Sequence, residues 1–382
     1  MRVLTVNAGS HSLELAVVDP DVAGKLVLAP AGADEPDPVL ATGGTDDPPA
    51  SEASRDALRE FLAGLDGIDG IDAVAHRLVH GGDPDDGGLT GPTLLDDDVR
   101  QELSAVADLA PLHVPPALDA LDAVREALPD VPQVVCVDTA FHRDLPEEAR
   151  TYPLPASWRA QGVRRFGFHG LSYAWTLERA AALLARDAGS LQVVLAHLGG
   201  GSSVCAVKDG VSVDTSMGFT PLEGVPMGSR SGSIDPGALV WLLRHGVDLD
   251  ELEDGLQHAS GLTALSDGLS ADTRELVAAA QAGNEVADLA LRVFSHRVAK
   301  EIAAQATNLD RLDALVLTGE IGWDQPEVRE AVCARLGQLD IAAEPMPNLT
   351  ADGSLSCGGT PVLAVRTREQ CRLALEAAGV LA

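Results

Sequence analysis

Two arginines stand where a guanidinium group could hold an anion. Arg230 lies between Ser229 and Ser231 in a loop rich in glycine and proline, and Arg77 comes near the end of an apolar run that leads to His80. A guanidinium group binds a carboxylate or a phosphate through two parallel hydrogen bonds. An ordinary strand end would also explain Arg77 and His80 taken alone. In so acidic a chain, however, this basic cluster favours an anion-binding role.

Glycine and serine gather at turns that could bind phosphate. Residues 199–203 separate two apolar runs, and a second glycine and serine turn at 7–12 does the same. Glycine lets the backbone approach a ligand closely, and backbone N–H groups together with serine hydroxyls can hold an anion. A dinucleotide-binding turn requires a helix directly after its glycines, but strand-like residues follow here. We therefore predict a hairpin tip at 199–203. A tight hairpin without any ligand explains this turn, taken alone, as well as a phosphate-binding turn does.

The strand–turn–strand pattern recurs along the chain. It covers residues 3–18 and 193–207, and a third apolar run at 314–318 enters a glycine-containing loop at Gly319. A repeated hairpin in separate halves indicates a duplicated nucleotide-binding architecture. This organisation is typical of the actin-like, sugar-kinase-like (ASKHA) superfamily. We therefore predict an α/β fold with two ribonuclease H-like domains.

The candidate residues need elements that hold them in place. Residues 133–138 have the composition of a buried parallel strand that ends in Asp138, and functional groups of open α/β sheets lie at such strand ends. Residues 163–170 supply two arginines, an aromatic residue and His169 ahead of a helix at 172–186. Helical spacing predicts further helices at 51–65, 97–108 and 116–128. Residues 20–50 are rich in Pro, Gly, Ala and Asp, and we expect weak strands joined by loops there.

Composition indicates a soluble enzyme. The chain has 382 residues, enough for two domains, and its net charge of −31 argues against nucleic acid and anionic membranes as partners. No apolar run reaches a membrane-spanning length, and no signal peptide is visible at the N-terminus. The five cysteines are scattered without metal-binding spacing. Reduced, buried thiols and a cytoplasmic location are therefore expected.

Across almost its whole length, the chain resembles the acetate/propionate kinase (acetokinase) family. The segments that carry the resemblance appear in the family's order. They are VNAGSHS (6–12), HRLVHGG (76–82), APLHVPP (110–116), VDTAFH (137–142), RRFGFHG (164–170), HLGGGSS (197–203), DTSMGFTPLEGVPMGSRSGSIDPG (214–237), SADTREL (270–276), LTGEIG (317–322) and TREQ (367–370).

The resemblance implies transfer of a phosphoryl group from ATP to acetate, with Mg²⁺ as the metal and Mn²⁺ as an alternative. A carboxylate has a pKa near ~4, so at neutral pH it needs positioning and charge neutralisation rather than a general base. The implied catalytic residues are Asp138, His169 and Arg230, the last two stabilising the transition state. The implied metal-binding residues are Asn7 and Glu369, with Asp138 as the second carboxylate of the acidic pair.

The resemblance also assigns substrate-binding residues. The acid is expected to contact Arg77, Val79, Leu112, Phe168 and Pro221. The nucleotide and its phosphates are expected to contact Ser12, His197, Gly199, Gly200, Gly201, Asp272, Arg274 and Gly322. The apolar positions are not enlarged, so a two- or three-carbon acid is favoured. Acetate and propionate differ by one methylene, worth only about 1–3 kcal/mol, so the preference between them stays open.

Several positions depart from the family pattern on the side of the phosphate donor. Glu14 replaces a usual lysine, Gly200 a usual asparagine, and the usual Gly-Ile-Gly-Glu-Asn loop has Glu320 at its start and Trp323 within it. Three hypotheses remain: an ATP-dependent acetate kinase, a related kinase using propionate or another donor such as pyrophosphate, and a non-catalytic binding protein. The intact set of candidate residues favours the first.

The resemblance implies two actin-like domains and a homodimer formed through the second of them. The first domain is expected at 1–150 together with a C-terminal helix at 367–382. The second is expected at 151–366, with the active site in the cleft between the two domains. The expected partners are the small acid and ATP or ADP.

Overall fold

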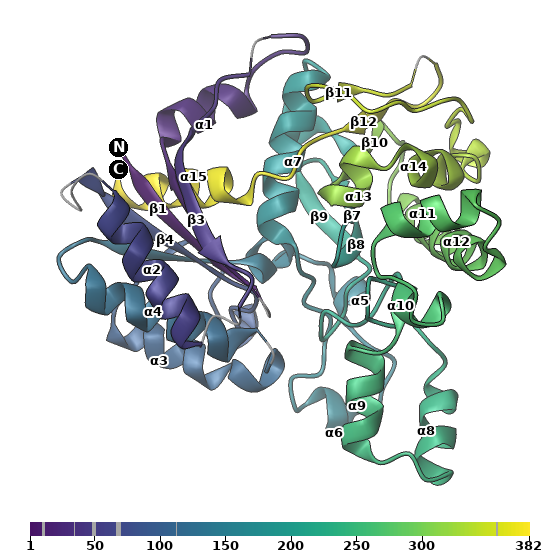
Figure 1. Cartoon of the computed structure of the whole chain (residues 1–382), viewed down its shortest axis with the longest axis horizontal. Coiled ribbons are helices and arrows are strands. Elements are labelled where there is room, and N and C mark those ends of the chain that lie inside the picture. Colours follow the sequence, from purple (N-terminus) through teal and green to yellow (C-terminus); the bar gives the residue numbers. More distant parts are fainter. Residues whose placement is uncertain (10–11, 34, 48–50, 66–69, 112, 357) are drawn as a thin grey trace. The chain divides into compact units, whose positions relative to one another are not determined.

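The structure, a computed structural model, describes residues 1–9, 12–33, 35–47, 51–65, 70–111, 113–356 and 358–382. It divides into two compact units (Figure 1). Unit 1 consists of Met1–Arg143, Phe168–Ala182 and Arg368–Ala382, and unit 2 consists of Asp144–Gly167 and Leu183–Thr367. The domain boundary near residue 150 stays a prediction, and each unit is described by itself below.

Unit 1 is built on a six-stranded sheet with the order β3-β2-β1-β4-β6-β5. Strands β1, β2 and β3 form an antiparallel meander, β1, β4 and β6 run parallel, and β5 is antiparallel to β6. The strand bounds are β1 Val3–Ala8, β2 Leu13–Val18, β3 Val39–Thr45, β4 Ala73–Leu78, β5 Thr93–Leu94 and β6 Gln133–Val137.

Helices pack on this sheet and close the core of unit 1. The C-terminal helix α15 returns from the end of the chain to contact β1, β4 and β6, while α4 also packs on β1 and β4. The core cluster unites apolar residues of β1, β2 and β4 with those of α2, α3 and α4. The helix bounds are α1 Pro20–Val27, α2 Glu52–Gly64, α3 Asp97–Ala105, α4 Val114–Ala127, α7 Gly170–Leu183, whose last residue lies in unit 2, and α15 Glu369–Leu381.

Unit 2 repeats the same sheet. Its order, β9-β8-β7-β10-β12-β11, has the same meander of three antiparallel strands, the same parallel strands and the same short antiparallel edge strand. The strand bounds are β7 Gln192–Leu198, β8 Ser202–Lys208, β9 Val211–Thr215, β10 Ala314–Thr318, β11 Gly353–Ser354 and β12 Val362–Ala364. The predicted duplication and the predicted hairpin at 199–203 are therefore present.

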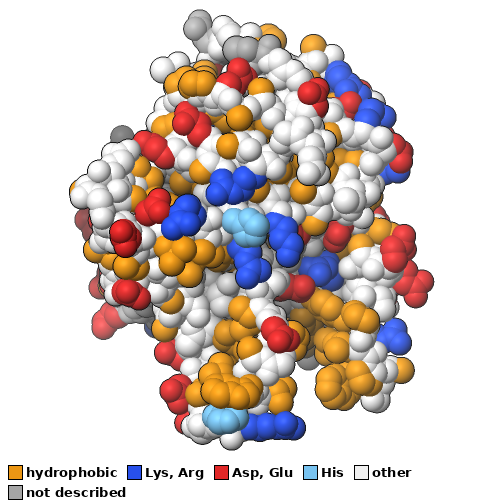
Figure 2. All heavy atoms as spheres, turned by 90° about the vertical axis from the view of Figure 1, so that its right-hand side faces the viewer, with side chains coloured by type: hydrophobic (Ala, Val, Ile, Leu, Met, Phe, Trp, Pro, Cys, Tyr) orange, Lys and Arg blue, Asp and Glu red, His pale blue; other side chains and the backbone are white. Residues whose placement is uncertain are grey.

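The long helix α12 supplies much of the core of unit 2, because it packs on β7, β8 and α14. Its exposed residues include four basic or imidazole side chains, Arg292, His296, Arg297 and Lys300. The face shown in Figure 2 carries a group of Lys and Arg side chains around a histidine and exposed hydrophobic side chains in its lower part. The helix bounds are α5 Glu147–Arg150, α6 Ala156–Arg159, α8 Pro236–Arg244, α9 Leu249–Gln257, α10 Gly261–Leu265, α11 Thr273–Gln281, α12 Glu285–Ala306, α13 Gly319–Asp324 and α14 Pro326–Cys333.

Two expectations about local structure were wrong. The segment 20–50 was expected to lack helices, but α1 begins at Pro20, where Asp19 caps the first turn by accepting hydrogen bonds from the N–H groups of Asp21 and Val22. Proline is favoured at the first helical position because its fixed φ suits the helix. The expected loop at Gly319 is instead the start of α13, which follows β10 without an intervening residue.

The cysteines that the structure describes are buried. Cys136 lies on β6 and Cys371 on α15 in unit 1, while Cys205 lies on β8 and Cys333 on α14 in unit 2. Cys357 lies outside the described residues. Within the described ranges, no helix is both long and apolar enough to cross a membrane.

Candidate active site

The register of the sheet in unit 1 brings Asn7 next to two charged residues. On β1, Asn7 pairs with Glu14 of β2 on one side and with Arg77 of β4 on the other. Asp138 directly follows β6, so it lies at the same carboxyl end of the parallel strands as Arg77. Sheet topology alone therefore gathers these predicted site residues.

Arg77 is the centre of this cluster. Its Nη2 donates to Asp138 Oδ2 at 2.7 Å, its Nε donates to the same oxygen at 3.2 Å, and its Nη1 donates to Asn7 Oδ1 at 2.9 Å. Glu369 Oε2, from the first turn of α15, lies 3.6 Å from Nη1. Asp138 thus fixes the plane of the guanidinium in the two-pronged geometry that suits a carboxylate.

Burial has a strong effect on Asp138. Its side chain is 1% exposed, and this burial raises the pKa of Asp138 above its ordinary value, with Glu369 adding to the rise and Arg77 opposing it. The N–H of Leu171 also donates to Asp138 and favours the ionised form. A buried carboxylate of this kind is held by its partners rather than by water.

Glu14 adds a third carboxylate to the surroundings of Asn7. The Nδ2 of Asn7 donates to Glu14 Oε2 at 3.2 Å and to Glu369 Oε2 at 3.4 Å, and Gln370 Nε2 also donates to Glu14 at 3.2 Å. A lysine here would add a cation beside Arg77, whereas Glu14 adds an anion. The charge of this part of the site is therefore shifted by two units from the usual family pattern.

His169 has a left-handed backbone, with φ of 60°. Such a conformation is strained for a residue other than glycine and persists only where the surroundings impose it. The next residue, Gly170, begins α7 so close to Asp138 that an added Cβ would lie 1.9 Å from the Asp138 carbonyl oxygen. His142 and the Phe168 carbonyl make a further contact of 3.0 Å on the other side. The segment that carries His169 is thereby anchored directly to the Asp138 turn.

Apolar residues predicted to line the acid pocket are buried in unit 1. Val79 is 5% exposed and Phe168 is 1% exposed, and the rings of Phe168 and His80 meet edge to face at 5.8 Å. Burial lowers the pKa of His80 to about 4, so it is neutral at pH 7. The role of Val79 and Phe168 as an apolar wall around the acid stays a prediction. Leu112, predicted for the same wall, lies outside the described residues.

The glycine turn of unit 2 occupies the position equivalent to the first turn of unit 1. His197 of β7 pairs with Ser203 of β8 and Thr318 of β10, as Asn7 does with its two neighbours. The turn is braced by Ser202, whose Oγ accepts from the Gly199 N–H at 3.1 Å and donates to the Gly199 carbonyl at 3.0 Å. An added Cβ at Gly200 would meet no atom within 4 Å. The glycine at 200 is therefore not required by packing.

Arg230 lies in a loop that contacts this turn. The N–H of Gly228 donates to the Gly200 carbonyl at 3.3 Å, and Arg230 Nη1 donates to the Pro221 carbonyl at 3.1 Å. The glycines 199–201, predicted to hold the phosphates, and Arg230, one of the two residues predicted to stabilise the transition state, thus share one region of unit 2. Pro221, predicted for the acid pocket, belongs to the same loop.

Two residues predicted to contact the nucleotide, Asp272 and Arg274, lie beside the segment that departs from the family pattern. Asp272 caps α11 and pairs with Arg274 at 3.3 Å. Arg274 also lies 4.0 Å from Glu320 and 3.8 Å from Asp324, both on α13. Arg274 is therefore surrounded by carboxylates, and its positive charge is already balanced by side chains of the protein.

A second cation stabilises α13. The guanidinium of Arg366 lies over the ring of Trp323, 4.6 Å from its centre, in a cation–π arrangement. Gly319 begins α13 with φ of 79°, and an added Cβ would lie 2.3 Å from the Leu198 carbonyl. Gly322 lies one turn further along α13 and is buried. Glycine is therefore needed at 319, where α13 leaves the sheet.

The predicted residues fall into two groups, one in each unit. Unit 1 holds Asn7, Ser12, Arg77, Val79, Asp138, Phe168, His169 and Glu369, and unit 2 holds His197, Gly199, Gly200, Gly201, Pro221, Arg230, Asp272, Arg274 and Gly322. Within unit 1, contacts join Asn7, Arg77, Asp138 and Glu369, while the Ser12 carbonyl accepts a hydrogen bond from the Gly9 N–H at 2.9 Å.

Sequence patterns did not reveal the partners of Arg165. This residue contacts Glu223, which also binds Tyr152, a residue in none of the segments that carry the family resemblance. The only sequence signal was the pair of consecutive arginines at 164–165.

Comparisons with known proteins assign the chain to a family. The acetokinase family model matches residues 2–374. An acetate kinase of Synechococcus sp. (strain JA-2-3B'a(2-13)) is 44% identical over 305 residues, covering 79% of this chain and 74% of that protein. An acetate kinase of Deinococcus deserti is 40% identical over 402 residues, covering 100% of this chain and 98% of that protein.

Solved structures give the same result. A propionate kinase from Francisella tularensis subsp. tularensis SCHU S4 matches with a TM-score of 0.88 and 30% identity over 99% of each chain. Porphyromonas gingivalis acetate kinase matches with a TM-score of 0.87 and 30% identity over 100% of each chain. The predicted fold class and the predicted class of enzyme, a kinase, are confirmed. The chain belongs to the acetokinase family.

Proposed function

We propose that this protein is an acetate kinase, which transfers the terminal phosphoryl group of ATP to acetate in a reversible, magnesium-dependent reaction. The observation that carries the proposal is family membership over residues 2–374. One carboxylate oxygen of acetate forms a bond to the γ-phosphorus, the bond between that phosphorus and ADP breaks, and acetyl phosphate leaves. No proton moves from acetate, because it is ionised at neutral pH.

The geometry of unit 1 supports a role for Arg77 in charge neutralisation. Its guanidinium is held in one plane by Asp138 and is oriented before any substrate arrives. Such preorganisation lowers the cost of binding in the transition state. We assign His169, in its imposed left-handed conformation, and Arg230 to the oxygens of the transferring phosphoryl group. Val79, Phe168 and Pro221 are assigned to the methyl group of the acid.

The residues around Asn7 fit a magnesium ion. An amide oxygen and the carboxylates of Glu369 and Asp138 are hard oxygen donors, which Mg²⁺ prefers. In the described part of the chain, no three His, Cys, Asp or Glu side chains form a complete metal site. We propose that the ion is bound by one or two carboxylates and completed by substrate phosphates, as is usual for Mg²⁺. When bound, the ion would neutralise phosphate charge, and Mn²⁺ is the alternative metal.

A second candidate differs in donor or acid. Arg274 is balanced by Asp272, Glu320 and Asp324, so this region offers little net positive charge to a nucleotide. That observation favours testing pyrophosphate and other nucleotides as donors. The 30% identical Francisella structure is that of a propionate kinase, so propionate is tested as the acid.

The assay that decides these points measures acyl hydroxamate formed from acetate or propionate with ATP, GTP or pyrophosphate. Turnover of acetate with ATP, lost on chelation of Mg²⁺, is expected. Turnover only with another donor would favour the second candidate. Absence of turnover with every donor would contradict both and favour a non-catalytic binding protein.

Location and assembly remain predictions. The net charge of −31 supports the absence of nucleic acid and anionic membrane partners. A cytoplasmic location stays an expectation from the cysteines. For a homodimer through unit 2, the support is α8, where no residue is buried and Trp241 is 57% exposed. Sedimentation equilibrium tests it, and a monomer at micromolar concentration would contradict it.

A further inference from the structure

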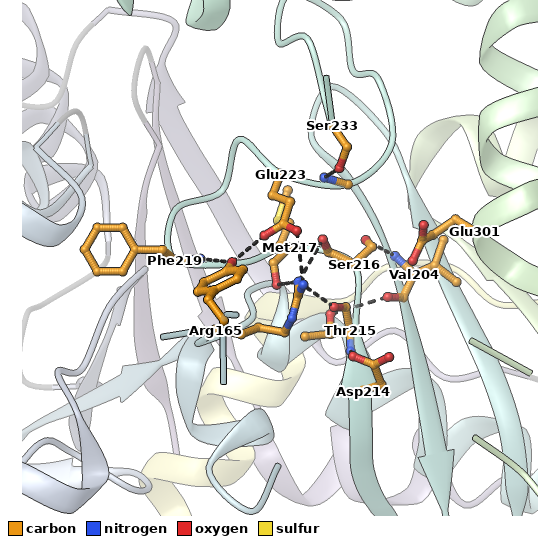
Figure 3. Close-up of polar contacts among 12 residues, drawn as sticks. Arg165, Val204, Asp214, Thr215, Ser216, Met217, Phe219, Glu223, Ser233 and Glu301 are labelled. Carbon is orange, nitrogen blue, oxygen red and sulfur yellow. Dashed lines mark hydrogen bonds and ion pairs between the residues drawn. The ribbon is translucent and has the colours of Figure 1, made fainter. Parts of the chain in front are cut away.

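A network of polar contacts lies under the loop that carries Arg230. Arg165 Nη1 donates to three consecutive carbonyls, those of Thr215 at 2.9 Å, Ser216 at 3.2 Å and Met217 at 2.9 Å (Figure 3). The Arg165 side chain is only 16% exposed. One guanidinium therefore fixes the backbone where the chain leaves β9, which ends at Thr215.

A carboxylate and a phenol complete the network. Glu223 accepts from Arg165 Nη2 at 3.1 Å and from the Tyr152 hydroxyl, and that hydroxyl accepts from the Phe219 N–H at 3.0 Å. The Arg165 guanidinium also lies over the Tyr152 ring, 5.5 Å from its centre. Arg165 thus holds the start of the segment 215–223, Tyr152 holds its middle at Phe219, and Glu223 at its end contacts both of those side chains.

The chain is fitted closely around these side chains. An added Cβ at Gly218 would lie 1.8 Å from Glu223 Oε2 and 2.0 Å from the Tyr152 hydroxyl. The Gly218 carbonyl accepts from the Phe166 N–H at 3.0 Å, so the residue that follows Arg165 holds the same segment through its backbone. Small displacements of the segment are therefore resisted by several independent contacts.

This segment is in direct contact with Arg230. Pro221 lies within it, and the Pro221 carbonyl accepts from Arg230 Nη1 at 3.1 Å. On its other side, the Arg230 carbonyl accepts from the Met227 N–H at 3.1 Å. Arg230 Nη1 also lies 3.8 Å from Met227 Sδ, so the Pro221 carbonyl of the segment 215–223 is one of the contacts that orient the Arg230 guanidinium.

We propose that Arg165, with Glu223 and Tyr152, is a positioning group that sets the place of Pro221 and the direction of Arg230 for phosphoryl transfer. The inference rests on the proposed function. Arg165 suits this role because a planar guanidinium reaches several carbonyls and a carboxylate together, whereas a lysine ammonium is a single point of attachment. Misplacing a catalytic group by about 1 Å can cost roughly 10²-fold in rate.

A double-mutant cycle tests whether Arg165 acts through Arg230. We expect Arg165→Met and Arg165→Lys each to lower kcat by about 10²-fold, with little change in the KM for ATP. Arg230→Ala should lower kcat by orders of magnitude, and adding Arg165→Met to it should lower kcat less than about threefold further, because residues that act as a unit are non-additive. Losses that multiply would overturn the proposal. Arg159→Met, at an exposed arginine on α6, is the matched control and should leave kcat unchanged.

Tyr152→Phe provides a milder variant in case Arg165→Met folds poorly. It removes one hydroxyl that contacts both Glu223 and Phe219. We expect a smaller fall in kcat that is likewise absent in the Arg230→Ala background. An equal fall in both backgrounds would contradict a positioning role.

Hydrogen exchange tests the positioning role of Arg165 independently of the proposed acetate kinase activity. In Arg165→Met, the amides of residues 216–227 should exchange faster than in the wild type, while those of α12 should be unchanged. Unchanged exchange at 216–227 would overturn the positioning role whether or not the wild type turns over acetate. Absence of wild-type turnover with faster exchange would contradict only the proposed function.

Discussion

The charges around Arg77 are mostly negative and would repel a phosphate that binds there. Arg77 donates to Asn7, and three carboxylates lie close to this pair: Glu14 beside Asn7, and Asp138 and Glu369 beside Arg77. Like charges at close range repel strongly where water is scarce. A nucleotide phosphate chain bound as proposed would meet this excess of negative charge, so we expect a divalent cation to be needed to bring phosphate near Asn7.

Glu14→Lys tests this charge balance. Replacing an anion by a cation beside Asn7 should lower the KM for ATP several-fold and weaken the dependence of activity on Mg²⁺ concentration, because lysine takes over part of the neutralisation. Both effects should shrink at high ionic strength, since exposed charges are screened by salt. The measurement is a titration of initial rate with ATP and with Mg²⁺.

Glu14→Gln is the control for this prediction. Glutamine keeps the length of the side chain and an acceptor for Asn7 and Gln370 while removing one charge. Its KM for ATP should lie between those of the wild type and Glu14→Lys. A KM that does not follow the charge at position 14 would show that Glu14 lies outside the influence of the phosphates.

The positions of single site residues could be predicted from the sequence, but their contacts could not. The place of Asp138 at a strand end could be predicted, because an apolar run followed by a carboxylate has a local signature. The contact of Asn7 with Arg77 depends on the register of strands 70 residues apart, and no local pattern encodes that register. For the same reason the partners of Arg165 could not be predicted.

At the scale of elements, the start of α7 is the most constrained point near the candidate site. Gly170→Ala would place a methyl group 1.9 Å from a backbone oxygen, which cannot rotate away. We expect a loss of about 3 kcal/mol in the free energy of unfolding, at the upper end for overpacking. Chemical denaturation checks this value.

The matched control for Gly170→Ala is another helical glycine. Gly255 lies within α9, and an added Cβ there would meet nothing within 4 Å. Gly255→Ala should leave stability unchanged or raise it by about 0.5–1 kcal/mol. Equal effects of the two substitutions would contradict the close contact between α7 and the Asp138 turn.

Strand β4 carries a pH-sensitive group. Burial lowers the pKa of His76 to about 4, although its contact with Gln133 at 2.7 Å opposes the shift. Between pH ~6.5 and about 4, His76 therefore binds a proton in the unfolded chain but stays neutral in the folded chain. Protonation of the unfolded chain lowers the free energy of unfolding, and this loss grows as the pH falls from about 6.5 toward 4. At pH 5 the loss is about 2 kcal/mol.

His76→Gln removes this titration. The difference in the free energy of unfolding between pH 7 and pH 5 should be smaller in the variant than in the wild type by about 2 kcal/mol. An exposed histidine, His245, supplies the control substitution His245→Gln, which should leave that difference unchanged. Identical pH dependence in wild type and His76→Gln would show that His76 is accessible to protons in the folded state.

Elements with strong periodicity could be predicted, and those set by capping could not. The helices near 51–65 and 97–108 and the strand at 133–138 lie where their apolar spacing indicates. In contrast, α1 depends on one capping aspartate followed by proline, within a composition that otherwise favours loops. Likewise α13 begins at Gly319, where the close approach of the Leu198 carbonyl requires glycine. A glycine directly after a strand resembles a turn in the sequence, so the helix could not be predicted.

At the scale of the molecule, the duplication of the fold could be predicted because both hairpins have the same local sequence pattern.

The fold must also tolerate a net charge of −31. Self-repulsion of this size opposes the compact state. Raising salt from about 0.1 M to about 1 M shortens the screening length from ~10 Å to ~3 Å, so we expect the Tm to rise over that range. A Tm that falls or stays constant would contradict a destabilising role for the charge.

The reactivity of the buried cysteines can report the local opening of each unit. Burial raises the pKa of the Cys205 and Cys333 thiols to about 12 and that of Cys371 to about 11, and it also raises the pKa of Cys136. Alkylation requires an accessible thiolate, so each thiol reacts only when its surroundings open. Because Cys136 and Cys371 belong to unit 1 while Cys205 and Cys333 belong to unit 2, the order in which these thiols are labelled under native conditions reveals whether the two halves of the duplicated fold open together or one at a time.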